Sequence, residues 1–388
     1  MNDLRSAIRV NRVFDGSTLW EGPVMVLVED GKITDVDRTG ALPPDGVSLT
    51  DLGDATLLPG LVDAHTHLAF DPEGKTETQM LGDNDATVLA RMRTHAQQAL
   101  HAGVTTVRDL GDRGYLALQL RQECRELPHI VASGPPITRT GGHCFYLGGE
   151  ADGPEEVAEA VADRARHGVD LIKIMATGGM STVGSDPGAA QYTHAELRTA
   201  VRTAHELGLP ITAHAHGTDG IAAAVAAGAD GVEHCTFMTR DGVQPDEQIV
   251  DAIAAAGVFV GCTVVRPRSG MPAEVLATIE PYWQNQAAMH ARGVRVVCCT
   301  DAGINPHKPH GILPSDVAYF ASRVAPNGAA LASVTSLAAD ACGLGHRKGR
   351  IAAGYDADML AVSGDPVHDI TALQKVEAVF RAGQPVYR

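Results

Sequence analysis

Two histidines, spaced two residues apart, give the first indication of chemistry in this chain. His65 and His67 close an apolar run. In an extended segment, residues i and i+2 lie on the same face, so both imidazoles can reach one metal ion. Taken alone, such a pair also fits two histidines that only make hydrogen bonds. The interpretation therefore depends on the other ligands that join them.

Lys173 lies in the segment LIKIM, with apolar neighbours on both sides. A strand covered on both faces would bury the ammonium at a high cost in free energy unless it had a partner. Burial favours the neutral amine, which can add carbon dioxide and become a carbamate able to bridge two cations. A buried ion pair, or a side chain that extends to the rim, is the alternative. The other candidate ligands favour the carbamate.

Three further candidate ligands each follow an apolar run. His214 and His234 end two of these runs, and Asp301 follows VVCCT. A single aspartate at such a position would more often cap the next helix. His216 competes with His214 for the ligand role. We prefer His214 because it lies nearer the strand, whereas His216 already enters the turn at Gly217.

Basic side chains follow two other apolar runs. Arg266 and Arg268 lie in VVRPRSG, and Arg139 precedes His143 in RTGGHC. Guanidinium groups recognise carboxylates through paired donors. These residues favour a substrate with an acidic group or a C-terminal carboxylate, and each arginine fits a solvated loop position equally well.

Eight apolar, β-branched runs must position these side chains: 56–65, 103–110, 129–134, 169–176, 210–215, 231–236, 257–265 and 293–301. Helical patterns lie between most of the runs, at 85–101, 154–167, 194–207, 218–227 and 279–291. This alternation predicts parallel strands, and eight units within residues 58–346 predict a (β/α)8 TIM barrel. The candidate ligands would then converge at the carboxyl ends of the strands. An open doubly wound sheet should carry a Gly-rich phosphate turn after its first strand, and the sequence has none there.

The two ends of the chain have a different pattern. Residues 1–57 and 347–388 resemble short strands joined by turns, with a hairpin at Asp30–Gly31. Each end alone is too small to bury much apolar surface. We therefore expect both termini to form one small β-sandwich domain beside the barrel domain of residues 58–346. Two independent β appendages are the alternative.

Composition limits the partners of the chain. Its 388 residues carry a net charge of −16, which argues against nucleic acid and anionic membranes because both bind basic surfaces. The seven cysteines include no CxxC pair, as is typical of reduced thiols in a cytosol. The first residues lack the apolar run of a signal peptide, and no apolar stretch approaches the ~18 residues of a membrane helix. We expect a cytoplasmic protein that acts on a small molecule.

The motifs also carry a resemblance. The segments LLPGLVDAHTHL, IKIMATGG, AHAHG, GVEHC and CCTDAG resemble the amidohydrolase superfamily. More narrowly, they resemble its imidazolonepropionase-related branch, which contains metal-dependent Xaa-Pro dipeptidases and ochratoxin-type amidases. The resemblance extends over nearly the whole chain, including GYDADML near the end. It implies a β-sandwich made from both termini and a homo-oligomer.

Carried over by position, the resemblance implies six ligands for two metal ions: His65, His67 and Asp301 for one ion, His214 and His234 for the other, and carboxylated Lys173 between them. It also implies that His143 contacts the substrate. Zinc suits these ligands best, and manganese or cobalt are alternatives. The deaminase relatives have a glutamate shortly after the strand-five histidine. Here Ala215, His216 and Gly217 follow, which disfavours deamination.

These residues predict a hydrolytic mechanism. Two cations ~3.5–4 Å apart can share a bridging water and lower its pKa enough to supply hydroxide near neutral pH. Asp301 would accept the proton and pass it to the leaving nitrogen. We expect a binuclear hydrolase of a C–N bond in an Xaa-Pro-like dipeptide or an N-acyl amino acid. Hydrolysis of a cyclic amide, ester or phosphoester, or a non-enzymatic metal-binding barrel, are the alternatives.

Overall fold

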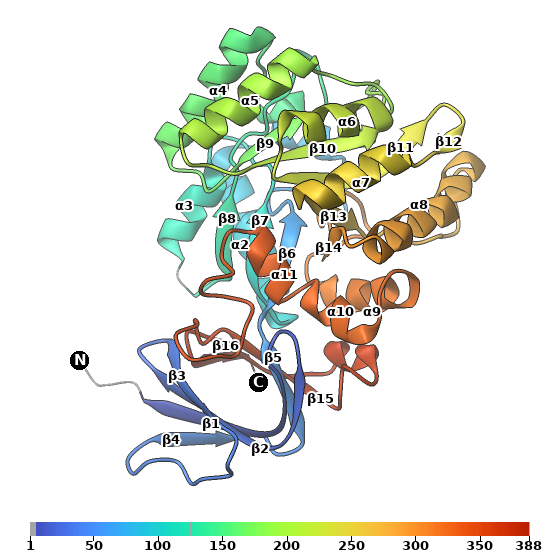
Figure 1. The fold of residues 1–388 in the computed structure, drawn as a ribbon. Coiled ribbons are helices and arrows are strands. Elements are labelled where there is room, and N and C mark those ends of the chain that lie inside the picture. Colours follow the sequence, from blue (N-terminus) through green and yellow to red (C-terminus); the bar gives the residue numbers. More distant parts are fainter. Residues whose placement is uncertain (1–4, 125, 388) are drawn as a thin grey trace.

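The structure is a computed structural model that describes residues 5–124 and 126–387. Figure 1 shows two parts, a curved sheet and a larger part in which helices surround parallel strands. The chain is therefore a mixed α/β protein with parallel sheets.

Strands from both ends of the chain share the curved sheet. Its order is β17-β16-β15-β5-β1-β2-β3, and β4 pairs with β1. Neighbouring strands are antiparallel, except that β1 runs parallel to β4 and β5. The bounds are β1 Ser6–Phe14, β2 Leu19–Glu29, β3 Lys32–Asp37, β4 Ser48–Asp51, β5 Ala55–Pro59, β15 Met359–Ser363, β16 Val376–Arg381 and β17 Gln384–Tyr387.

This sheet has an apolar cluster of its own. Val26, Leu57 and Phe380, from both ends of the chain, are buried in it together. The sheet curls so that β3 meets a segment that precedes β15, where the N–H of Ile33 donates to the carbonyl of Tyr355 at 2.9 Å. Both termini thus build one sheet, while the domain boundaries expected after residues 57 and 346 stay a prediction.

Eight parallel strands form the larger part, in two hydrogen-bonded sheets. Their orders are β6-β7-β8 and β14-β13-β11-β10-β9, with the short β12 antiparallel to β11. Each of the eight predicted runs overlaps one of the parallel strands. The bounds are β6 Leu61–Thr66, β7 Val104–Asp109, β8 His129–Ala132, β9 Ile172–Met175, β10 Ile211–Gly217, β11 Gly231–Thr239, β12 Gly242–Val243, β13 Phe259–Thr263 and β14 Arg295–Cys299.

Isolated parallel bridges link the two sheets at both of their edges. Ile137, which follows β8, pairs with Ile174 of β9, and Thr66 pairs with Ala302, which follows β14. At the second seam the N–H of Asp301 also donates to the carbonyl of His65 at 2.7 Å. The strand order therefore continues across both seams, but through single bridges rather than continuous ladders.

Helices lie on the outer side of the parallel strands (Figure 1). The helix predicted at 279–291 begins earlier, at Ala273, and Pro281 lies inside it. None of the helices in the described ranges is both long and apolar enough to cross a membrane. The bounds are α1 Thr76–Gly82, α2 Asp85–His101, α3 Leu116–Glu123, η1 Phe145–Leu147, α4 Gly153–His167, α5 His194–Glu206, α6 Thr218–Ala227, α7 Glu247–Ala256, α8 Ala273–Ala291, α9 Leu313–Arg323, α10 Asn327–Ala332, α11 Ser336–Ala341 and η2 Ile370–Gln374.

The run predicted as one strand at 56–65 is divided at Gly60. The chain leaves the terminal sheet at Pro59 and enters the parallel strands at Leu61. A Cβ on Gly60 would lie 2.1 Å from the Oγ1 of Thr105. Only glycine lets the backbone pass so close to the neighbouring strand β7 at this junction.

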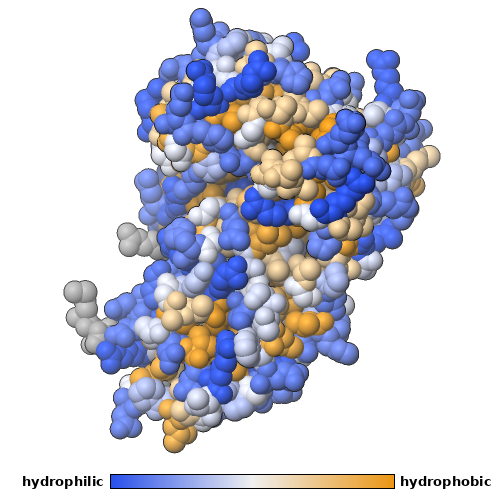
Figure 2. Space-filling model, viewed as in Figure 1, coloured by the Kyte–Doolittle hydropathy of each residue, from blue (hydrophilic) through white to orange (hydrophobic). Residues whose placement is uncertain are grey.

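The molecular surface mixes polar and apolar areas. On the face drawn in Figure 2, hydrophilic side chains gather along the outer edges, and patches of apolar surface lie between them. Scattered apolar surface is normal for a folded protein. The homo-oligomer implied by the resemblance therefore stays a prediction.

A buried carboxylate helps to join the terminal sheet to the parallel strands. Asp358 accepts hydrogen bonds from Lys348 and Arg381, and its carbonyl accepts from the N–H of Gly60 at 2.8 Å. Arg381 in turn donates to the carbonyl of Leu127, which precedes β8. Burial alone would raise the pKa of Asp358, but Lys348 and Arg381 lower it below its usual range.

We expect Asp358→Ala to lower the free energy of unfolding by about 3–5 kcal/mol, because removing one partner of a buried ion pair leaves the other charges without it. Urea denaturation near pH 7 measures this loss. Because the folded-state pKa of this carboxyl is depressed, its stabilisation is present above about pH 4 and is lost as the pH falls further. Asp45→Ala, at an exposed position, should change stability by about 0.5 kcal/mol or less. If both substitutions lowered the free energy of unfolding by the same amount, Asp358 would not help to join the terminal sheet to the parallel strands.

Candidate active site

Two histidines and an aspartate form a first cluster at the ends of adjacent strands. His65 lies at the end of β6, His67 just beyond it, and Asp301 just beyond β14. The Nε2 atoms of both imidazoles lie 3.4 Å from Oδ1 of Asp301, and all three residues are buried. Three ligand atoms this close together can hold one metal ion.

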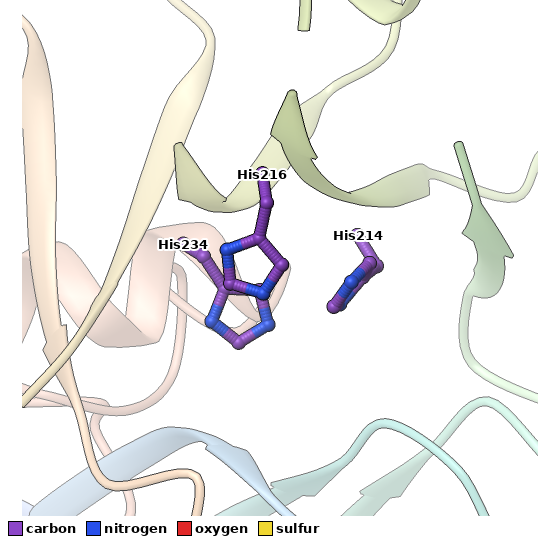
Figure 3. A group of neighbouring side chains, drawn as sticks. All are labelled: His214, His216 and His234. Carbon is purple, nitrogen blue, oxygen red and sulfur yellow. The ribbon is translucent and has the colours of Figure 1, made fainter. Parts of the chain in front are cut away.

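Three histidines form a second cluster, shown in Figure 3. His214 and His216 come from β10 and His234 from β11, with ligand atoms within 4.8 Å of one another. The ring of His216 stacks on that of His234 at 4.5 Å between centroids. His214 meets the ring of His234 edge-on at 4.6 Å. The two histidines that competed for the strand-five position in the sequence thus lie side by side in one cluster.

The two clusters adjoin each other, and a lysine is buried with them. The rings of His65 and His234 lie 5.1 Å apart between centroids. Lys173 of β9 lines the same cavity, is only 2% exposed, and its Nζ has no hydrogen-bond partner among the described residues. Burial lowers the pKa of Lys173 to about 8. A buried amine without a partner is costly in free energy, and this one lies beside six metal-type donors.

Hydrogen bonds from outside the clusters fix three of the imidazoles. Nδ1 of His65 lies 2.9 Å from Glu233, and Nδ1 of His234 lies 2.9 Å from the hydroxyl of Thr263. Nε2 of His214 lies 3.0 Å from the carbonyl of Gly178. Each ring therefore keeps its other nitrogen free for a metal ion, as histidine ligands of metals usually do.

Glu233 stands at the centre of this outer support and was missed by the sequence reasoning. Its carboxylate accepts hydrogen bonds from Arg108 at 3.0 Å and from Thr212 at 2.7 Å, besides contacting His65. Burial would raise the pKa of Glu233, but Arg108 and His65 lower it well below its usual range. A Cβ on Gly261 of β13 would lie 2.0 Å from this carboxylate, so glycine makes room for it. A charged residue inside the apolar run GVEHC was the signal that could have revealed it.

The backbone is strained at one residue of each cluster. Asp301 and His234 adopt left-handed conformations, with φ of 56° and 68°. Residues other than glycine rarely occupy this region, and such strain collects at functional sites. The surrounding ladders hold both residues in place, which directs their side chains into the cavity.

Electrostatics keep the site in the protonation state that metal binding requires. Burial lowers the pKa of His65 and of His216 to about 4, and it lowers the pKa of His214 and His234 well below the usual range. Burial would raise the pKa of Asp301, but the nearby histidines and Lys308 lower it below its usual range. Neutral imidazoles and an ionised carboxylate are the metal-binding forms.

The clusters lie in one cavity of about 690 Å³. This volume suits a small-molecule site. Apolar side chains form much of the wall, among them Met175, Met180, Met238, Met271, Ile279 and Ile304. The cavity thus offers metal-type donors on its floor and apolar surface beside them.

Some of the residues predicted to contact the substrate line the cavity in the structure, and one does not. His143 lines the cavity, is 4% exposed, and its Nδ1 lies 2.9 Å from the hydroxyl of Thr182. Arg266 and Arg268 also line the cavity, but Arg266 is engaged by Asp316 at 2.7 Å. Arg139 is exposed and lies outside the cavity lining, because its loop turns the side chain to the surface. Among the predicted basic residues, Arg139 is therefore not brought to the site.

Comparisons with known proteins agree with this arrangement. The amidohydrolase family matches residues 56–386. Ochratoxinase of Aspergillus niger is 27% identical over 364 residues, covering 83% of this chain and 73% of that protein. Imidazolonepropionase of Pseudomonas putida is 27% identical over 366 residues, covering 84% and 83%. The crystal structure of a Xaa-Pro dipeptidase with bound methionine matches with a TM-score of 0.88 at 27% identity, covering 98% of this chain and 99% of that one.

The family match includes all eight parallel strands and both clusters of candidate ligands. The resemblance that the motifs carry is confirmed, and so is the expectation of an enzyme. This chain is a hydrolase that belongs to the amidohydrolase family.

Proposed function

We propose that the protein is a binuclear metal-dependent hydrolase that cleaves the C–N bond of an amide. The observation that carries the proposal is Lys173, which is buried in the same cavity as two adjoining clusters of metal-type donors and whose Nζ has no hydrogen-bond partner among the described residues. In this proposal the two parallel sheets together form a (β/α)8 barrel over residues 58–346. Residues 1–57 and 347–388 form its β-sandwich domain.

The donor set fits two divalent cations, with zinc as first choice and manganese or cobalt as alternatives. His65, His67 and Asp301 would hold one ion, and His214 and His234 the other. Lys173, as a carbamate, would lie between them. When bound, such ions polarise a carbonyl and lower the pKa of water enough to supply hydroxide near neutral pH.

Asp301 is the proposed catalytic acid–base. Its carboxylate lies between two of the histidines and is held ionised, so it can accept a proton. As water adds to the scissile carbonyl carbon, Asp301 takes the proton from the water. It then delivers that proton to the nitrogen as the C–N bond breaks, so that an acid and an amine leave.

The substrate is proposed to be an Xaa-Pro-like dipeptide or an N-acyl amino acid. The names of two similar proteins, a Xaa-Pro dipeptidase and an ochratoxinase, support this class. The apolar wall of the cavity suits a bulky side group, and His143 is a polar contact beside it. A cyclic amide, ester or phosphoester is the alternative substrate, because the same chemistry serves each bond.

A substrate panel tests the proposal. Dipeptides, N-acyl amino acids, lactams and esters would be incubated with the protein, and free amine or acid measured. We expect turnover of an acyclic amide whose amine side carries a free carboxylate. Turnover of lactams or esters alone would favour the alternative, and an inert protein with both metal sites filled would contradict the proposal.

We expect Asp301→Asn to lower kcat by at least about 10²-fold, because the amide cannot accept a proton. Circular dichroism should show an unchanged fold. Asp45→Asn, the same change at an exposed position, should leave kcat unaltered. A loss below tenfold for Asp301→Asn would refute the proton-transfer role.

We expect Lys173→Ala to lose both activity and bound metal, because the carbamate no longer supplies two oxygens. The space left by the side chain should admit a short carboxylate, so acetate or propionate should restore part of both. Elemental analysis and turnover measure the two effects. Metal content and turnover equal to those of the unmodified protein would rule the carbamate out.

A further inference from the structure

A second buried lysine lines the cavity and has no role in the proposed metal site. Lys308 follows β14 in the loop that leads to α9 and is 8% exposed. The sequence reasoning did not single it out. It forms part of the cavity wall together with Arg266, Ile304 and Ile312. Its amine is thus enclosed by protein on most sides and open to the place where a substrate would bind.

Among the described residues, the side chain of Lys308 makes one hydrogen bond. Its Nζ donates to the carbonyl of Thr300 at 2.6 Å. Within the described ranges, no carboxylate oxygen lies within 4.0 Å of this Nζ. An ammonium group has three donors. Two donors of a buried cation are therefore left without a protein acceptor, which is costly unless a ligand completes them.

Lys308 favours the ionised form of two nearby carboxyls, those of Asp316 and Asp301, but forms an ion pair with neither. Asp316 faces Arg266 at 2.7 Å, and Asp301 faces His65 and His67 at 3.4 Å each. Arg266 thus forms a close ion pair with a carboxylate, whereas Lys308 forms none among the described residues. Of these two cations, Lys308 is the one whose ammonium keeps donors available beside the cavity.

We propose that Lys308 binds a carboxylate of the substrate and so determines the preference of the site for acidic ligands. The inference rests on the proposed function and assigns a specific partner to the carboxylate of that substrate class. The apolar wall at Met271 and Ile304 would receive the remainder of the molecule. The ligand is thus an apolar carboxylic acid rather than a small polar anion.

A structural role is the competing explanation, because Lys308 also holds the carbonyl next to Asp301. A positioning role would affect acidic and neutral ligands alike, whereas recognition of charge affects only the acid. The ratio of the two affinities separates the roles. A binding assay also needs no turnover, so its outcome is independent of whether the substrate panel succeeds.

Isothermal titration of the metal-loaded, full-length protein with 4-phenylbutyrate and with its neutral amide, 4-phenylbutyramide, provides the test. The unmodified protein should bind the acid at least tenfold more tightly than the amide. Lys308→Met should bring that ratio close to one, with affinity for the amide unchanged. Lys375→Met removes the same charge from an exposed site between η2 and β16 and should preserve the ratio.

Lys308→Arg keeps the positive charge and should retain most of the preference, which guards against a folding defect in Lys308→Met. The proposal is overturned if Lys308→Met keeps the full acid preference, since the metal ions would then supply it. It is also overturned if Lys308→Met weakens binding of the acid and of the amide by the same factor. Equal binding of the acid and the amide by the unmodified protein would also refute it.

Discussion

The hydrogen bonds of one buried carboxylate, that of Glu233, join several of the parallel strands, and the rest of the site depends on them. From β11 this carboxylate contacts Arg108 of β7, His65 of β6 and Thr212 of β10, and it lies over Gly261 of β13. These strands belong to both parallel sheets. A buried charge is tolerated only when it is fully paired, so the strands must keep one register for the network to form. The same register places His65 in the lining of the cavity.

The site itself contrasts with this satisfied network. Glu233 has hydrogen-bond partners on several strands, whereas the Nζ of Lys173 has none among the residues that the structure describes. The left-handed backbone of Asp301 and His234 adds further strain at the same place. Buried amines without partners and strained backbone usually persist in a protein only where a function or a ligand requires them. We therefore take the site to be complete only with the proposed cations.

Periodicity predicted the strands well, because buried parallel strands are continuous apolar runs. It could not divide the run at 56–65, since the cause is a close approach between Gly60 and Thr105 from another strand. Periodicity also missed the first turns of α8, which begins at Ala273 and contains Pro281. A contact between segments that are far apart in the sequence cannot be inferred from the spacing of residues within one segment.

The candidate ligands were predictable for a similar reason, since each follows a strand whose end has a fixed place in the fold. Loop residues have no such constraint. Arg139 and Lys308 both follow strands at the same rim, yet the first is exposed and the second is buried. The path of each loop accounts for this difference in exposure. Spacing along the sequence therefore predicts which residues gather at the strand ends better than it predicts which loop residues line the cavity.

Anomalous diffraction from a crystal of the metal-loaded protein tests the central claim most directly. The account predicts two metal peaks in each chain. One should lie among His65, His67 and Asp301, the other beside His214 and His234, with added density on Nζ of Lys173 between them. A single peak would contradict a binuclear site, and two peaks beside an unmodified Lys173 would contradict the proposed carbamate.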